Sequence, residues 1–282
     1  RLDKVMTGFN KEKDRENVEW SNTWIDNAKN FGCPRILLVG DSVSREFRSS
    51  LGKLLPKYAV DFVGSSASIE DDLLYDVCDI FFKNKEYNYS LILVNIGGKH
   101  GMYLHTADNA EDAERYEQAY QKFLGYLYSH TPNIVILTTT PNVRVDNLKK
   151  FDDNVNKEIC SRNKIQTQVS ETLAFQTINL YFHVVQQKFK YRDTQHFSGK
   201  KYQLALADYI ISSLSALRLI TQIRPHYRIR WQGIFSAELA EHNKLKIKWG
   251  YGLYKVVRVN GVIKYYLADF CIKTKVRKSN HG

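Results

Sequence analysis

The sequence predicts an α/β protein built on a parallel sheet and followed by a small β-rich module. Short apolar runs, such as those at 35–39 and 91–96, alternate with longer segments of helical periodicity, such as 110–128. Runs this short suit strands buried on both faces, and their alternation with helices favours a parallel sheet covered on both sides. The 282 residues, with 43% hydrophobic and 25% charged, allow a full core.

The elements of the first part follow from apolar spacing and from Gly and Pro stop signals. We expect strands at 35–39, 58–63, 91–96, 134–139 and 177–180. We expect helices at 16–31, 44–55, 71–82, 110–128, 152–163 and 199–217. Gly32 with Pro34, Pro56 and Pro141 supply clear stops.

Residues 219–282 differ in character from the rest. They hold 13 Lys and Arg against 3 Asp and Glu, whereas residues 1–218 hold 28 against 27, so the net charge of +11 lies almost wholly in this segment. Strands are expected at 226–231 and 244–249, and a hairpin at 253–270 turns on Asn260-Gly261. We therefore expect two domains, 1–218 and 219–282, the second with an acidic partner.

Four cysteines (Cys33, Cys78, Cys160 and Cys271) are widely separated and form no Cys-x-x-Cys pair, which argues against a zinc site. We expect free thiols in a reducing compartment and place the chain in the cytoplasm. No apolar run approaches the ~20 residues of a spanning helix, and no signal peptide is evident at the first residues. The chain begins without Met, so it can be a fragment or a processed form.

Gly40-Asp41-Ser42 ends the first apolar strand and precedes a helical segment. Open α/β sheets bind ligands at the carboxyl ends of their strands, where a following helix also directs its N-terminal N–H groups. Ser42 is therefore a candidate nucleophile. The alternative is that Asp41 or Ser42 only caps the helix.

Asp193 and His196 lie between the last predicted strand and the closing helix. A histidine can take a proton from Ser42 and return it to a leaving group, because its pKa is near neutrality. Asp193 can accept the other ring N–H and so fix the tautomer. The alternative is a loop histidine beside a capping aspartate.

Two further residues stand at strand ends and could stabilise a developing oxyanion. The backbone N–H of Gly64 can donate where the missing side chain lets a substrate approach, and the Asn95 amide can donate to the same oxygen. The alternatives are a turn glycine, and an asparagine that is satisfied by the backbone.

This order of residues resembles the SGNH, or GDSL-like, hydrolases, over about residues 33–217. The resemblance implies a flavodoxin-like three-layer αβα fold with a parallel five-stranded sheet. It implies Ser42 as nucleophile, His196 as base and Asp193 as its orienting carboxylate, with an oxyanion hole from the N–H groups of Ser42 and Gly64 and the amide of Asn95. It implies no metal and no organic cofactor, and activity on ester-linked acyl groups of carbohydrates, lipids and small esters.

One motif departs from the common pattern of that family. Asn95 is followed by Ile96 and then by Gly97-Gly98-Lys99-His100, not by Asp. This is similar to the Asn-x-Gly-x-x-His variation of polysaccharide-directed branches, including the PC-esterase-like group. His100 is therefore a candidate substrate contact, the alternative being a plain loop histidine.

Aromatic and basic residues are interleaved in the C-terminal module, including Trp231 and Trp249, which we name as candidate substrate contacts. Aromatic rings with cations suit an acidic glycan and also single-stranded nucleic acid, although no RNA-binding signature is present. The alternative is that the aromatics form a small β core and the lysines solvate it.

The leading hypothesis is a serine esterase or O-acyltransferase that acts on an acylated, anionic carbohydrate through an acyl-Ser42 intermediate. Water and a sugar hydroxyl can each accept the acyl group from the same acyl-enzyme, so the sequence leaves both acceptors open. Two alternatives remain: a non-catalytic protein that binds anionic glycans on the same scaffold, and a nucleic-acid-associated protein that binds through its basic module.

Overall fold

The computed structural model describes residues 9–83 and 87–220 with their side chains, and the backbone of six strands between 227 and 276. The chain divides into two compact units, Arg1–Leu219 and Ile220–Gly282. The division falls one residue beyond the predicted boundary. The assignment of catalysis to the first unit and of a basic binding surface to the second stays a prediction.

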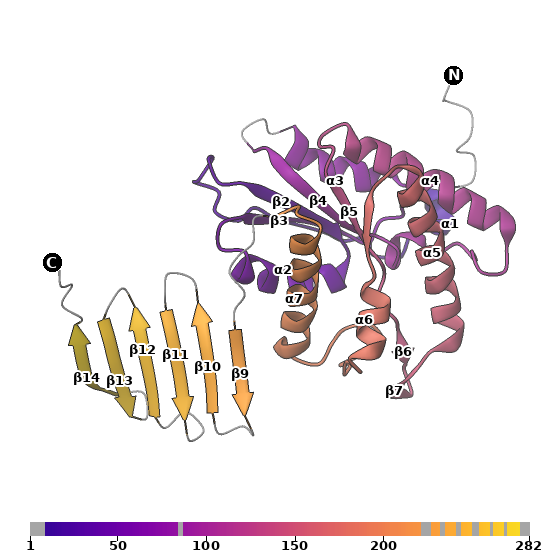
Figure 1. The fold of residues 1–282 in the computed structure, drawn as a ribbon. Helices are drawn as coiled ribbons and strands as arrows, with labels where there is room; N and C mark the ends of the chain where they lie inside the picture. The colour runs from indigo at the N-terminus through magenta and orange to yellow at the C-terminus, as the bar shows by residue number, and fades with distance from the viewer. Residues whose placement is uncertain are drawn as a thin grey trace. The chain divides into compact units, whose positions relative to one another are not determined.

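A six-stranded sheet with the order β1-β3-β2-β4-β5-β8 forms the middle of the first unit (Figure 1). Its strands are β1 (Ser21–Trp24), β2 (Arg35–Gly40), β3 (Ala59–Ser65), β4 (Tyr89–Asn95), β5 (Ile134–Leu137) and β8 (Gln176–Ile178). Every neighbouring pair is parallel except β1 with β3. The five parallel strands follow the flavodoxin-like order, which confirms the predicted fold class.

Helices cover both faces of this sheet, as the alternation of strands and helices predicted (Figure 1). They are α2 (Ser42–Leu54), α3 (Asp72–Phe82), α4 (Ala110–Tyr128), α5 (Asp153–Thr172), α6 (Leu180–Gln186) and α7 (Lys200–Ala216). Leu37 and Val39 of β2 pack in one core with Phe123 of α4. Side chains alternate along a strand, so Ile36 and Leu38 face the opposite layer, and both are fully buried.

The N-terminal segment differs from the sequence prediction. In place of a helix at 16–31, a short helix α1 (Lys11–Asp14) is followed by the edge strand β1. Val18 is 73% exposed and Trp24 is 51% exposed, so the helix-like spacing does not correspond to a buried face. Pairing of β1 with β3 overrides the local pattern, and the sheet gains one antiparallel strand beyond the five predicted.

Smaller elements were also not anticipated. A hairpin of β6 (Val143–Arg144) and β7 (Asn147–Phe151) follows β5, and a one-turn 3-10 helix, η1 (Lys99–Gly101), follows β4. Helix α5 extends nine residues beyond its predicted end at 163. Cys33, Cys78 and Cys160 are free, as expected, whereas Cys271 lies outside the described side chains. Within the described residues, no helix is long and apolar enough to cross a membrane.

The second unit contains an antiparallel six-stranded meander in the order β14-β13-β12-β11-β10-β9. Its strands are β9 (Tyr227–Trp231), β10 (Phe235–Ala240), β11 (Lys244–Trp249), β12 (Tyr254–Val259), β13 (Val262–Leu267) and β14 (Phe270–Val276). Val259 pairs with Val262, as the predicted two-residue hairpin requires. The strands β10 and β14 were not predicted.

Candidate active site

Ser42 lies at the switch point of the sheet, where the chain leaves β2 for β3 on one side and later returns to β4 on the other. β2 is buried along its whole length, and Ser42 is the first residue of α2. Asp41 caps that helix, because its Oδ1 accepts from the Val43 N–H at 2.9 Å. Asp41 is therefore the residue that caps this helix, one of the two caps that the sequence allowed. Ser42 does not cap the helix, and its hydroxyl lies at the carboxyl ends of the strands, where open α/β sheets bind ligands.

The structure brings Ser42, His196 and Asp193 together. Nε2 of His196 lies 2.7 Å from Oγ of Ser42, and its Nδ1 lies 2.9 Å from both carboxylate oxygens of Asp193. Ser42 and His196 are 154 residues apart in the sequence. A serine bonded to an imidazole, which is bonded in turn to a carboxylate, is the arrangement that activates a hydroxyl as a nucleophile.

The loop that carries Asp193 and His196 is held by its own backbone. Oδ1 of Asp193 accepts from the N–H groups of Gln195 and His196, at 3.0 and 2.8 Å. Partial burial works to raise the pKa of Asp193, but these N–H groups and the His196 ring outweigh it and hold the pKa below its ordinary value. The carboxylate therefore stays ionised and can stabilise an imidazolium.

Two contacts tie this loop to the rest of the first unit. Arg192 pairs with Glu46 of α2 at 2.5 Å, and the Val143 N–H donates to the Thr194 carbonyl at 2.8 Å. Glu46 is one helical turn after Ser42, so the ion pair links the serine's helix to the histidine's loop. Sequence reasoning missed Glu46 and Arg192, because an acidic residue and a basic residue 146 positions apart give no local signal.

Gly64 does not offer its N–H as the oxyanion prediction requires. It lies inside β3, opposite Asn22 of β1, and the Ser66 N–H two residues along donates to the Trp20 carbonyl at 3.1 Å. Bonded pairs recur every second residue in an antiparallel ladder, so the Gly64 N–H faces β1. Glycine suits this position for another reason: a Cβ here would lie 2.5 Å from the Phe62 ring.

Asn95 also fails to match its predicted role. It is buried, and its Nδ2 donates to the carbonyls of Leu137 and Thr138 at 2.8 and 3.2 Å. Its Oδ1 accepts from Oγ of Ser44 at 3.0 Å. Both kinds of polar atom on this amide are therefore engaged, and the backbone-satisfied alternative describes it. Gly40 makes room for the arrangement, since a Cβ there would meet Oγ of Ser44 at 2.2 Å.

His100 is fully buried, so the structure does not place it as a surface contact for substrate. Its Nδ1 lies 2.6 Å from the Ala67 carbonyl, while Nε2 has no hydrogen-bond partner among the described residues. Burial lowers the pKa of His100, although the nearby Asp41 carboxylate acts in the opposite direction. The ring is therefore neutral, and its contact with Ala67 connects the segment after β4 to the segment after β3.

Trp231 and Trp249 lie in β9 and β11, and each pairs with Phe235 of the strand between them. Their side chains lie outside the described part of the structure, so their substrate contact stays a prediction. The described residues include no cluster of His, Cys, Asp and Glu that could hold a metal ion.

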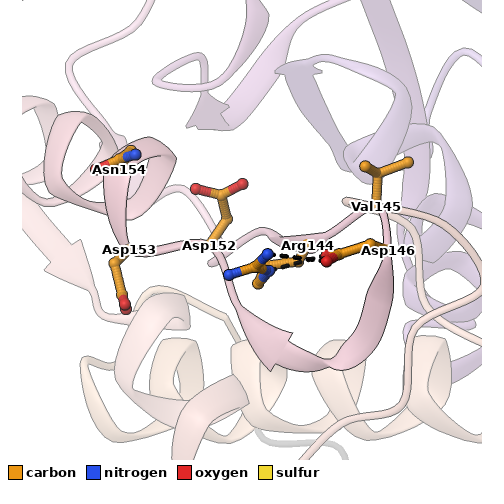
Figure 2. A pocket seen from close by; sticks show the side chains of 6 residues that line it. All are labelled: Arg144, Val145, Asp146, Asp152, Asp153 and Asn154. Carbon is orange, nitrogen blue, oxygen red and sulfur yellow. Dashed lines mark hydrogen bonds and ion pairs between the residues drawn. The ribbon is translucent and has the colours of Figure 1, made fainter.

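A pocket of about 390 Å³ opens beside the β6–β7 hairpin (Figure 2). Arg144 and Asp146 lie on one side of it, joined by two hydrogen bonds of 2.8 Å, and residues 152–154 at the start of α5 lie on the other. None of the predicted site residues lines this pocket. It is consequently separate from the serine and its histidine.

Comparison with solved structures finds several proteins that this chain resembles. An acetyl xylan esterase matches at 15% identity with a TM-score of 0.49, over 64% of this chain and 99% of its own. An acetylxylan esterase from Geobacillus stearothermophilus matches at 13% and 0.46, over 67% and 95%. A GDSL-like lipase from Bacteroides thetaiotaomicron matches at 14% and 0.45, over 65% and 88%.

No protein-family model and no curated protein matches the chain. The roles considered for Ser42, Asp193 and His196 therefore rest on the contacts these three residues make.

Proposed function

We propose that this protein is a serine esterase or O-acyltransferase that removes or transfers an acyl group, preferably acetyl, on a carbohydrate. One observation carries the proposal: Oγ of Ser42 and Nε2 of His196 lie 2.7 Å apart, and Asp193 holds the other ring nitrogen at 2.9 Å. This distance is within reach for proton transfer from the hydroxyl. The position of Ser42 at the carboxyl edge of the sheet supports the same role.

In the first half-reaction, Oγ of Ser42 attacks the ester carbonyl carbon while its proton passes to Nε2 of His196. The carbonyl electrons move to the oxygen, which becomes the oxyanion of a tetrahedral intermediate. When the intermediate collapses, the bond to the sugar oxygen breaks and His196 returns the proton to that oxygen. An acyl-Ser42 ester and a free sugar hydroxyl result.

In the second half-reaction, water or another sugar hydroxyl attacks the acyl-Ser42 carbonyl, and His196 again accepts and returns one proton. Water gives hydrolysis, whereas a sugar hydroxyl gives transfer. Asp193 stays ionised throughout and stabilises the imidazolium, which agrees with the lowered pKa of its carboxyl.

The Ser42 N–H is the oxyanion donor that the local structure favours. Ser42 is the first residue of α2, and N–H groups of a first helical turn have no partner within the helix. The positive end of the α2 dipole adds to the attraction for negative charge. Because the polar groups of Gly64 and Asn95 are engaged elsewhere, we assign the oxyanion to this helix terminus.

Carbohydrate as the alcohol component rests on the resemblance of residues 95–100 to polysaccharide-directed branches and on the basic character of residues 219–282. We propose that the first unit acts on the ester and that the second brings an anionic polymer to it. A steep salt-dependent affinity for single-stranded nucleic acid that exceeds the affinity for anionic polysaccharide would contradict this role for the second unit.

The test is release of acetate from acetylated oligosaccharides, and of nitrophenol from p-nitrophenyl acetate, by the intact chain. We expect turnover by the wild type, and a loss on the order of 10⁴- to 10⁶-fold for Ser42→Ala. Ser129→Ala, at the far end of α4, is the matched control and keeps wild-type rates. Turnover that persists in Ser42→Ala, or is absent from the wild type on both substrates, would contradict an acyl-Ser42 mechanism.

A second function is favoured by the engaged amide of Asn95. With that donor committed to β5, the same scaffold could bind an acylated glycan without cleaving it. Binding of an acetylated polysaccharide that is equal in wild type and Ser42→Ala, together with absent turnover by the wild type, would support this alternative over the esterase.

A further inference from the structure

A groove of about 430 Å³ lies beside the loop that carries Asp193 and His196, and none of the candidate site residues lines it. It is bounded by the β6–β7 hairpin, by α6 and by residues 188–191. Apolar side chains form most of its lining, namely Val143, Leu148, Phe151, Val185, Phe189 and Tyr191. Three lysines, Lys149, Lys188 and Lys190, complete it. Its volume is within the range of ligand sites, about 300–1,000 Å³.

The groove shares a wall with the loop that holds His196. The N–H of Val143 donates to the Thr194 carbonyl at 2.8 Å, and Tyr191 forms an isolated β-bridge with Phe197. The hydroxyl of Tyr191 donates to the Pro141 carbonyl at 2.7 Å. Two buried lining residues are thus fixed by hydrogen bonds to segments that flank Asp193 and His196. A molecule in the groove would lie next to this loop.

All the charged residues that line the groove are basic. Lys149, Lys188 and Lys190 are exposed, and the lining contains no acidic residue. Within the part of the chain that the structure describes, none of these three lysines forms an ion pair, whereas eleven other Lys and Arg residues of the first unit do: Lys11, Arg15, Arg35, Arg48, Lys83, Lys99, Arg115, Arg144, Lys157, Arg162 and Arg192. Their ammonium groups are available to an anionic ligand.

We propose that this groove binds an acidic sugar residue, such as a uronate, of the same polymer whose ester is presented to Ser42. This inference rests on the proposed function, since it places the substrate next to the loop of His196. The half-exposed ring of Phe151 offers an apolar surface to the C–H face of a sugar. The lysines offer charge-assisted hydrogen bonds to its carboxylate.

The charge also distinguishes this occupant from an acyl chain. A hydrocarbon chain would fill the apolar lining but would leave three ammonium groups without a function, whereas a carboxylated sugar uses both. The groove would then select the acidity of the polymer, while Ser42 and His196 act on its ester.

Binding can be measured without catalysis by titrating Ser42→Ala with unacetylated oligogalacturonide in a calorimeter. We expect the pair Lys149→Glu and Lys190→Glu, introduced together in Ser42→Ala, to raise Kd at least tenfold. The matched control is Lys29→Glu with Lys57→Glu, which changes the net charge equally at exposed positions away from the groove lining. We expect the control to change Kd less than twofold. An equal rise in Kd for both pairs, or no change for either, would overturn the groove assignment.

Kinetics on the otherwise wild-type chain separate this proposal from the proposed function. For Lys149→Glu with Lys190→Glu, we expect KM for an acetylated oligogalacturonide to rise at least tenfold more than KM for a neutral acetylated xylo-oligosaccharide. If the chain turns over no ester yet the calorimetric difference holds, the groove stands and the esterase fails. If the variant instead changes the preference between p-nitrophenyl octanoate and p-nitrophenyl acetate, the groove holds an acyl chain and our proposal is wrong.

Discussion

The carboxyl ends of β2 and β4 lie side by side in the sheet, with Gly40 paired to Asn95, yet they present polar groups in opposite ways. After β2, the hydroxyl of Ser42 is bonded to a histidine from a distant loop. At the end of β4, the Asn95 amide is bonded to the β5 backbone and to Ser44. Two buried strands that end in polar residues therefore have different consequences. The difference depends on whether neighbouring strands already satisfy the polar group.

The largest expected effect concerns the β2 side of this comparison. In Asp193→Asn, the new amide can no longer stabilise the imidazolium and favours the wrong tautomer of His196, so kcat for p-nitrophenyl acetate should fall on the order of 10⁴-fold. Asp146→Asn, in the β6–β7 connection, is the control with the same chemical change. Activity of Asp193→Asn within tenfold of wild type would contradict an orienting role.

A substitution at Asn95 tests the β4 side. In Asn95→Ala, the Leu137 and Thr138 carbonyls and the Ser44 hydroxyl lose a buried partner, which should lower the free energy of unfolding by about 1–3 kcal/mol. Chemical denaturation measures this, with ester turnover per folded molecule measured in parallel. We expect turnover to stay within a few fold of wild type.

Ser44→Ala sharpens that experiment, because it removes only the donor to Oδ1 of Asn95 and leaves both bonds to the Leu137 and Thr138 carbonyls. It should be less destabilising than Asn95→Ala. A 100-fold loss of turnover in Asn95→Ala with the fold intact, and none in Ser44→Ala, would restore Asn95 as an oxyanion donor.

The smallest effect is a pH dependence at His100. Its pKa is lowered from 6.5 by burial, so the unfolded chain binds a proton below about pH 6.5 while the folded chain does not. The stability contributed by the neutral ring is therefore present above that pH and is lost as the pH falls toward the folded pKa. Between pH 7 and pH 5, Tm of the wild type should fall more than Tm of His100→Gln. Parallel curves would show that the ring does not titrate with unfolding.

Much of the fold could be predicted because the apolar periodicities are strong. The helix at 110–128 has the bounds of α4, and the buried runs at 35–39 and 91–96 became β2 and β4. The helix predicted at 16–31 was wrong, because a short aromatic pattern fits an edge strand as well as a helix. Only its pairing with β3 decides between them.

The candidate site was likewise predictable from the sequence only in part. The strand-end position of Ser42 and the position of the Asp193-x-x-His196 pair before the closing helix were visible in the sequence, and the topology brings them together. The direction of the Gly64 N–H and the partners of the Asn95 amide were not visible, since β1 and β5 determine them. A sequence shows which polar residue ends a strand, but the neighbouring strands determine whether its polar atoms stay free.

The central claim is that Ser42 is an activated nucleophile. A fluorophosphonate probe, reacted with the intact chain and located by peptide mass spectrometry, tests it most directly because the label needs no natural substrate. The account predicts a single adduct on Ser42 that is lost in Ser42→Ala and greatly slowed in His196→Ala. An adduct on another serine, or labelling of Ser42 at the same rate in His196→Ala, would contradict it.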